Sequence, residues 1–559
     1  MTKGKLEIST LLTTLSPERL ARHYADRHWR DKTIYDHVCD YAEQTPDAPA
    51  IHDCFRTIDY STLRKSADAL ALDLYRRGLR AGQRVAVWSP SRFETAATLL
   101  ACSRNGYVCC SSLHRDHTVG DIVGLIDRMR ATALVFEVGY GADAERIDFD
   151  AAIKSMGSLS CIYKLPPLSE TTVLAPLFDG CFKDVDQAIQ PNPVKTPDAP
   201  VYLAFTSGSS GEPKGVLHSN NTLLANSRSI TVDWNMNAQS VIYSMSPLSH
   251  NLGFGAMINA FTVGGALVIH DLVKGNSLVD RLADTGTSFL FGVPTHAIDL
   301  LDELEARPEI KLDKLAGFRI SGAAVPDHVC MKLTERAIMP QSGYGMTEAC
   351  SHNYTMPDDN PQRIMTTSGC TCDSYEIQIF DRENQDEVLP AGEVGQIGGR
   401  GASLMLGYFN DQAATEDAFN TEGWFMTGDL GWVDEAGYIR ITGRKKDVII
   451  RGGHNIFPAR VEGLAITHDR LKQVAAFPVA DERLGERVCL AAVVIDSKPF
   501  DPSDLLFHLE KEGLSKYDMP EFFLKLEAMP LTASGKILKR KIVDWVVEGR
   551  VTPRPLRAN

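Results

Sequence analysis

The chain has 559 residues, enough for more than one domain, and its 44% hydrophobic and 23% charged residues are typical of a globular protein. A net charge of −14 argues against a general nucleic-acid-binding protein. The longest apolar run, residues 488–495, is far too short to cross a bilayer, and the polar first ten residues do not read as a signal peptide. We therefore expect no membrane insertion.

The twelve cysteines include no Cys-x-x-Cys pair. Cys109 and Cys110 are adjacent, and Cys370 and Cys372 are one residue apart, which is poor spacing for zinc ligands. Scattered cysteines of this kind indicate reduced core residues, so we expect a cytoplasmic protein.

Strand and helix patterns alternate from residue 50 onward. The first helix of this series is expected at residues 61–78, with Ser61 as its N-cap. Helices at 92–105 and around 120–130 are each followed by a short apolar strand. Repeated strand–helix units predict an α/β fold with doubly wound, mostly parallel sheets.

The alternation resumes after residue 216. Helices are expected at 222–232, at 257–263 and from Pro294 onward. From about 373 to 443 the pattern changes to short strands and Gly-rich turns, which predicts a small β unit. After a break at residues 443–447 comes a small α+β unit. We therefore predict an N-terminal domain at 1–445 and a C-terminal domain at 446–559.

One loop is rich in the groups that bind phosphate. Residues 206–215 contain four hydroxyl side chains, three glycines and Lys214. Glycines let backbone N–H groups point inward to form a nest for anions, and the lysine adds a positive charge. Gly215 after the lysine excludes a Walker A loop. A flexible linker is the alternative, but the apolar strand 201–203 directly before the loop favours a polyphosphate site.

A second set of candidate binding residues follows the end of a strand predicted at residues 341–343. Tyr344 offers a flat face for a base, Thr347 a hydroxyl, and Glu348 a hard oxygen ligand for Mg²⁺. The alternative is a structural turn with an exposed acid.

Three further residues could bind a nucleotide or act on a substrate. Asp429 stands in a Thr-Gly-Asp turn, where its carboxylate could accept hydrogen bonds from both hydroxyls of a ribose. The alternative is a turn with a purely structural role, which is the more common case for such a sequence. Lys536 is the first of four basic residues in a loop, and is either a catalytic finger or a solvated surface group. His250 could gate a pocket or satisfy a buried contact.

Together these blocks resemble the adenylate-forming superfamily, which comprises acyl- and aryl-CoA synthetases, nonribosomal adenylation domains and luciferases. The resemblance covers residues 35–545 and includes five blocks in the family's order: 206–215, 247–250, 344–348, 427–429 with 443–447, and 530–536. The sequence departs from the family's pattern at two places. Ser209-Ser210 replaces the commoner Thr-Thr and keeps the hydroxyls, and Arg460 stands where the family usually has Glu, with Glu462 two residues later.

The resemblance implies an ATP site. The β- and γ-phosphates would contact Thr206, Ser207, Gly208, Ser209, Ser210, Gly211 and Lys214. Adenine would lie between Tyr344 and the segment Gly322, Ala323 and Ala324, with Gly343, Gly345 and Met346 nearby. Thr347 would contact the α-phosphate, and Glu348 with Thr206 would hold Mg²⁺. Asp429, Arg444 and Ile441 would bind the adenosine.

It also implies a mobile C-terminal domain that swings about Lys446, brings Lys536 to the α-phosphate, and presents Gly452, Gly453 and His454 to coenzyme A. Lys214, His250, Thr347, Glu348 and Lys536 would be catalytic. The acyl pocket would be lined by His250, Asn251, Phe254, Gly292, Ser321 and Gly345.

The implied function is an AMP-forming carboxylate–CoA ligase with ATP, Mg²⁺ and coenzyme A. No acid follows His250 to pair with an ammonium group, which disfavours amino acids. Residues 24–38 resemble the corresponding stretch of aryl-acid adenylating enzymes and of alicyclic or aryl CoA ligases, and the implied acyl pocket is mostly uncharged and fairly short. We therefore expect a ring-bearing or medium-sized carboxylic acid. Two alternatives stay open: a stand-alone adenylating enzyme that loads a carrier protein, and a non-catalytic nucleotide-binding homologue. The oligomeric state, with a homodimer among the options, is also open.

Overall fold

The computed structural model describes residues 16–154, 156–169, 191–206, 213–270, 272, 276–322, 325–495, 500–531 and 537–556. The chain divides into two compact units. The first comprises residues 1–376 and 400–419, and the second comprises 377–399 and 420–559. The domain boundary that the sequence predicts at residues 445 and 446 stays a prediction.

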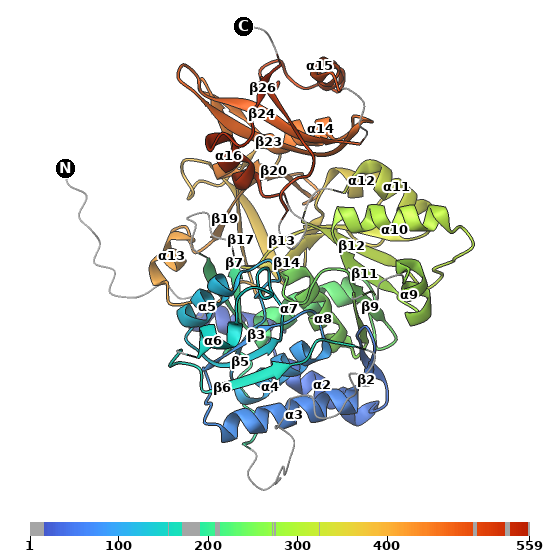
Figure 1. The fold of residues 1–559 in the computed structure, drawn as a ribbon, viewed down its shortest axis with the longest axis vertical. Helices are drawn as coiled ribbons and strands as arrows, with labels where there is room; N and C mark the ends of the chain where they lie inside the picture. The colour runs from blue at the N-terminus through green and yellow to red at the C-terminus, as the bar shows by residue number, and fades with distance from the viewer. Residues whose placement is uncertain are drawn as a thin grey trace, which may run out of the picture. The chain divides into compact units, whose positions relative to one another are not determined.

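The larger sheet of the first unit has nine strands (Figure 1). Parallel pairs make up its centre, and β14 turns antiparallel to β13 near one edge. The order is β15 (Cys370–Thr371), β14 (Cys350–Tyr354), β13 (Met339–Met346), β12 (Gly317–Ser321), β11 (Phe289–Gly292), β9 (Val241–Ser244), β10 (Ala266–Ile269), β1 (Pro49–His52) and β2 (Thr57–Asp59).

The second sheet of this unit has seven strands. Its core is parallel, and the hairpin of β7 and β8 adds an antiparallel pair. The order is β18 (Gly407–Tyr408), β8 (Lys214–Ser219), β7 (Pro200–Thr206), β4 (Val108–Cys110), β3 (Arg84–Trp88), β5 (Ala131–Glu137) and β6 (Cys161–Leu165). The predicted α/β class with mostly parallel sheets is confirmed.

Helices cover these sheets. On the larger sheet, buried residues such as Leu290 and Phe318 pack with Leu300 of α10 and Val329 of α11. The helices of the first unit are α1 (Pro17–Ala25), α2 (Ile34–Gln44), α3 (Tyr60–Arg76), α4 (Phe93–Asn105), α5 (Val119–Arg128), α6 (Phe149–Ile153), α7 (Asn220–Asp233), α8 (Asn251–Val263), α9 (Leu278–Thr285), α10 (Pro294–Ala306), α11 (Asp327–Glu335), α12 (Pro361–Thr366) and α13 (Gln412–Asp417).

Two predicted helix starts were wrong. The N-cap of α3 is Asp59, whose side chain accepts from the Thr62 N–H at 2.6 Å, and Ser61 lies inside the first turn. Helix α8 begins at Asn251 instead of residue 257. Its first turn contains Gly253, where a Cβ atom would lie 2.3 Å from the Pro247 carbonyl oxygen, so packing requires a residue with low helix propensity.

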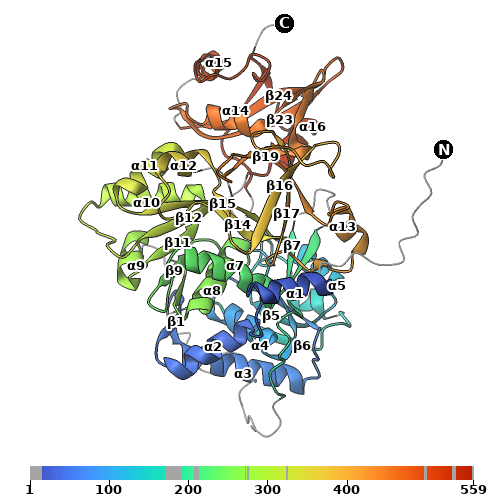
Figure 2. The same ribbon diagram turned by 180° about the vertical axis from the view of Figure 1, so that it is seen from behind.

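The second unit contains most of a four-stranded sheet and a six-stranded sheet (Figure 2). The first confirms the predicted small β unit, with the order β16 (Tyr375–Phe380), β17 (Gly395–Gly401), β19 (Phe425–Val433) and β20 (Ile439–Arg444). The second contains β21 (Ile449–Arg451), β22 (His454–Ile456), β23 (Leu471–Asp481), β24 (Gly485–Val494), β25 (Phe522–Leu526) and β26 (Arg554–Pro555). Its helices are α14 (Pro458–Ala465), α15 (Pro502–Lys511) and α16 (Lys539–Val547), with a 3-10 turn η2 at Lys445–Asp447. Throughout the described ranges, every helix is too short or too polar to span a bilayer.

Candidate functional site

The predicted phosphate loop connects the two strands of a hairpin. Thr206 at the end of β7 pairs with Lys214 at the start of β8, and its hydroxyl donates to the Lys214 carbonyl oxygen at 3.5 Å. The antiparallel pairing thus holds both ends of the loop together. Ser207, Gly208, Ser209, Ser210 and Gly211 lie outside the described residues.

The predicted adenine segment lies at the carboxyl ends of β12 and β13. These strands are parallel, with Ser321 opposite Gly343, and the Ser321 hydroxyl donates to the Gly343 carbonyl oxygen at 3.1 Å. Tyr344 follows on β13 and is half-buried. Ligands of parallel sheets gather at such strand ends. Gly322 follows β12 directly, whereas Ala323 and Ala324 lie outside the described residues.

Tyr408 links the phosphate hairpin to Glu348. The Lys214 ammonium lies 4.7 Å from the centre of the Tyr408 ring, a cation–π contact. The Tyr408 hydroxyl donates to Glu348 Oε1 at 3.0 Å. Burial, followed by the negative charge of Glu348, raises the pKa of the Tyr408 phenol, so it stays protonated and able to donate. Motif reasoning missed this residue, and no local signal in the sequence marks it.

His218 fixes the backbone of the Thr347 segment. One ring nitrogen lies 2.7 Å from the Thr347 carbonyl oxygen and the other lies 3.0 Å from the Thr222 hydroxyl. Burial lowers the pKa of His218 to about 4, so the ring is neutral at physiological pH. The Met405 N–H donates to the Glu348 carbonyl oxygen at 2.7 Å, so the backbone beside each predicted catalytic side chain is held from another element.

The donor set at Glu348 suits Mg²⁺. A carboxylate and a hydroxyl, here Glu348 and Thr206, are the hard oxygen ligands that this ion prefers. Among the described residues, no cluster of three or more His, Cys, Asp or Glu side chains is arranged to hold a metal ion. Protein sites for Mg²⁺ commonly supply one or two such ligands and leave the rest to water and substrate phosphates, so the chemistry of Glu348 and Thr206 is compatible with this ion.

The predicted acyl-pocket residues come from several elements. His250 is the N-cap of α8, and its side chain accepts from the Leu252 N–H at 3.3 Å. The Asn251 amide donates to the Met346 carbonyl oxygen at 3.4 Å, which joins α8 to the end of β13. Phe254 is buried and stacks on Tyr202 with ring centres 3.9 Å apart. Gly292, Ser321 and Gly345 lie at the ends of β11, β12 and β13.

In the second unit, the predicted ribose-binding pair is in direct contact. Asp429 and Arg444 face each other across β19 and β20, and Arg444 Nε donates to Asp429 Oδ1 at 3.0 Å. The Asp429 N–H donates to the Thr427 hydroxyl at 3.1 Å. Ile441 lies on β20, opposite Gly431.

Three other residues predicted to act from this unit, Lys446, Gly452 and Gly453, lie on turns, and His454 begins β22. Lys446 is in the 3-10 turn after β20; burial, followed by the charge of Arg444, lowers the pKa of its ammonium. Gly452 and Gly453 connect β21 and β22 with φ of 56° and 85°, which the hairpin requires. The next residue, His454, lies 2.8 Å from Asp518 Oδ1. Lys536 lies outside the described residues.

Comparison with known proteins identifies the family of this chain. Residues 39–409 match the AMP-binding enzyme family and residues 460–536 match the AMP-binding enzyme C-terminal domain. The chain is 30% identical over 535 residues to the medium-chain fatty-acid–CoA ligase of Escherichia coli K12, covering 94% of this chain and 92% of that one. It is 28% identical over 513 residues to the sulfoacetate–CoA ligase of Cupriavidus necator, covering 90% and 96%.

The fold is also that of a solved structure, ATP-bound MatB from Rhodopseudomonas palustris. The TM-score is 0.79 at 24% sequence identity, over 92% of this chain and 98% of the other. Since a single family match spans more than half of the sequence and lies on the elements that carry the phosphate hairpin and the Tyr344 segment, the chain belongs to the AMP-binding enzyme family.

Proposed function

We propose that this chain is an AMP-forming carboxylate–CoA ligase that activates a ring-bearing or medium-sized carboxylic acid. The observation that carries the proposal is the contact series from Lys214 through Tyr408 to Glu348, because it joins the hairpin proposed to bind phosphate to the segment after β13 that is proposed to bind nucleotide and Mg²⁺. The relatives named above are themselves acid–CoA ligases.

The reaction has two steps. The substrate carboxylate attacks the α-phosphorus of ATP, which forms an acyl-adenylate and releases pyrophosphate. The thiolate of coenzyme A then attacks the acyl carbon, and AMP leaves. The enzyme contributes positioning and charge neutralisation, because the leaving groups come from the nucleotide itself.

Each proposed residue has a role in this scheme. Lys214 binds the terminal phosphates, Tyr344 stacks on adenine, and Thr347 contacts the α-phosphate. Asp429 and Arg444 bind the ribose hydroxyls, and Lys536 stabilises the charge that develops during adenylation. Mg²⁺, held by Glu348 and Thr206, would offset phosphate charge.

The substrate class is supported by two observations. Asn251, an uncharged amide, follows His250 and contacts the Met346 carbonyl oxygen, so the chain has no carboxylate at this position to pair with an amino group. The Escherichia coli relative is named for medium-chain fatty acids. The eleven cysteines of the described ranges are free thiols, in keeping with a reducing, cytoplasmic location.

Pyrophosphate exchange with a panel of acids tests the proposal. We expect exchange with aryl, alicyclic or medium-chain acids, and AMP release that accelerates when coenzyme A is added. Acceleration by a phosphopantetheinyl carrier protein, with none by coenzyme A, would favour the carrier-loading alternative. A protein that binds ATP but yields no AMP with any acid would be a non-catalytic homologue.

A further inference from the structure

Arg319 is a buried cation that has no carboxylate partner among the residues described by the structure. It lies in the middle of β12, and its side chain is fully buried. Its contacts are a hydrogen bond of 2.5 Å from Nη1 to Gln341 Oε1 and the Tyr354 ring, whose centre lies 5.4 Å from Cζ. Among the residues that the structure describes, Nε and Nη2 have no hydrogen-bond partner. Two nitrogens of the guanidinium, which together carry three N–H donors, are therefore unsatisfied.

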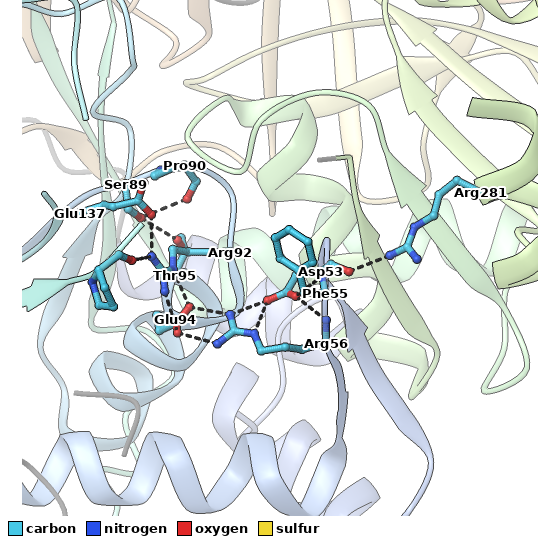
Figure 3. A network of polar contacts seen from close by, with 11 residues as sticks. Asp53, Phe55, Arg56, Ser89, Pro90, Arg92, Glu94, Thr95, Glu137 and Arg281 are labelled. Atoms are coloured by element: carbon cyan, nitrogen blue, oxygen red, sulfur yellow. Dashed lines mark hydrogen bonds and ion pairs between the residues drawn. The ribbon is translucent and has the colours of Figure 1, made fainter. Parts of the chain in front are cut away.

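Other buried arginines of the same unit are paired with acids. Figure 3 shows Arg56 between Asp53 and Glu94, and Arg92 between Glu94 and Glu137. In that network each guanidinium has two carboxylates as partners. Among the described residues, the charged groups that act on Arg319 include no Asp or Glu, so Arg319 differs from the arginines of this network.

Burying an unpaired charge is costly, since desolvation is not offset by a counter-ion. Burial lowers the pKa of Arg319 to about 10, and Tyr354 and Cys372 oppose this weakly. The guanidinium is therefore still charged at neutral pH. A charge maintained at this cost calls for a function, because a neutral side chain would be more favourable for stability alone.

Arg319 lies on the same strand as one residue of the predicted acyl pocket. Ser321, a predicted pocket residue, is two positions further along β12 on the same face, about 7 Å away at the rise of a strand. The guanidinium also lies against Gly343 of β13, where a Cβ atom would be 2.6 Å from Nη2. Gly343 leaves this space to the arginine, directly before Tyr344.

Neighbouring polar groups are unsatisfied as well. Within the described part of the chain, Gln341 Nε2 has no partner, and both atoms of the Asn353 amide on β14 lack one. The unsatisfied atoms of Arg319 and Gln341 are donors, and Asn353 adds one donor and one acceptor, so donors predominate and the complementary group is mainly an acceptor. A planar oxyanion fits the guanidinium fork best.

We propose that Arg319 binds a second oxyanion, a carboxylate or sulfonate, carried by the acid that the enzyme activates. This inference rests on the proposed function and narrows its substrate class to ring-bearing or medium-sized acids with an anionic group remote from the reacting carboxylate. The reacting carboxylate would lie toward Ser321 and the strand ends, and the second group toward the middle of the sheet.

Matched acids test this. Adipate is compared with hexanoate, and terephthalate and 4-sulfobenzoate with benzoate, by AMP release at fixed ATP, Mg²⁺ and coenzyme A. We expect kcat/KM for at least one dianionic acid to exceed that of its monoanionic partner by about 10-fold or more. The aromatic pair distinguishes a carboxylate from a sulfonate as the second group. A preference for the monoanion in every pair would overturn the proposal.

Variants separate binding from structure. Arg319→Met should lower kcat/KM for the preferred dianion by about 30-fold or more, chiefly through KM, and change that of its monoanionic partner by less than about 3-fold. Arg319→Lys retains the charge but loses the fork, and should be intermediate. An equal loss on all acids would assign Arg319 a structural role and contradict the proposal.

A thermal-shift assay makes the result independent of turnover. At least one of the three dianions should raise the melting temperature of the wild-type protein more than its monoanionic partner does, and Arg319→Met should abolish the shift. If no acid gave AMP, the proposed function would fail while this shift still tested the anion site. Absence of a shift with all three dianions would overturn the inference, whatever the activity.

Discussion

The Tyr408 hydroxyl donates a hydrogen bond of 3.0 Å to the Glu348 carboxylate. The two residues are 60 positions apart in the sequence, and the pairing of β18 with β8 places Tyr408 beside the phosphate hairpin. The carboxylate proposed to hold Mg²⁺ is thus oriented by a side chain that also contacts Lys214. Residues of this kind commonly set the geometry of a metal ligand.

Tyr408→Phe should reduce activity without loss of the fold. The ring stays under Lys214, but the donor to Glu348 is lost, and a hydrogen bond to a charged group contributes about 1.5–3 kcal/mol. We expect kcat/KM for ATP to fall about 10-fold and the Mg²⁺ concentration for half-maximal pyrophosphate exchange to rise. Tyr408→Leu, which also removes the ring beside Lys214, should lower kcat/KM for ATP further. Wild-type Mg²⁺ dependence in Tyr408→Phe would contradict the orienting role.

Asp429→Ala should impair recognition of the ribose. The carboxylate lies at 3.0 Å from Arg444 and is proposed to accept from the sugar hydroxyls. We expect the KM for ATP to rise about 10-fold or more. The wild-type enzyme should also discriminate against 2′-deoxy-ATP, and the variant should not. An unchanged preference for ATP over the deoxy analogue in the variant would place the ribose elsewhere.

Much of the architecture could be predicted from local pattern. The alternation of strands and helices predicts the parallel sheets. The Gly/Ser-rich segment after an apolar strand is predicted as a phosphate loop, and the structure adds that its ends, Thr206 and Lys214, are paired in a hairpin. Antiparallel pairing of β19 with β20 brings together Asp429 and Arg444, 15 residues apart, as the resemblance implies. These features depend on short segments whose sequence is itself informative.

Features set by distant segments could not be predicted. Tyr408 reaches Glu348 only because β18 joins the edge of the smaller sheet, and no local pattern encodes that pairing. Local pattern does not indicate that Arg319, between Phe318 and Ile320, is buried, because both faces of β12 are covered by segments distant in the sequence. The early start of α8 at Asn251 was obscured by Gly253, whose role is close packing against Pro247.

Lys536→Ala should separate the two half-reactions. The residue is proposed to stabilise charge during adenylation, so acyl-AMP formation should fall by about 100-fold or more, while thioester formation from supplied acyl-AMP changes little. Lys541→Ala is a suitable control, because the Lys541 ammonium lies 5.9 Å from the Trp545 ring centre and has no proposed catalytic role. Equal losses in both half-reactions would refute the assignment of Lys536.

Glu94→Gln should destabilise the first unit without altering the KM for ATP. Glu94 accepts from Arg56 and Arg92 in the buried network of Figure 3, and breaking such a pair costs about 3–5 kcal/mol. We expect the melting temperature to fall by several degrees. Asp150→Asn is the matched control, because its partner Lys164 is about half exposed and surface pairs contribute about 1 kcal/mol or less.

The loss of stability caused by Glu94→Gln should depend on pH. Burial raises the pKa of Glu94, but the hydrogen bonds and charges of Arg56 and Arg92 outweigh it, so the net pKa lies below the ordinary value. A carboxyl with a lower pKa in the folded state stabilises the protein above its unfolded pKa, about 4.3, and loses this contribution as the pH falls through the folded value. The difference in melting temperature between wild type and Glu94→Gln should therefore be constant from pH 7 to 5 and narrow at lower pH. A difference that widens on acidification would show that Glu94 is not stabilised as a carboxylate by the two arginines.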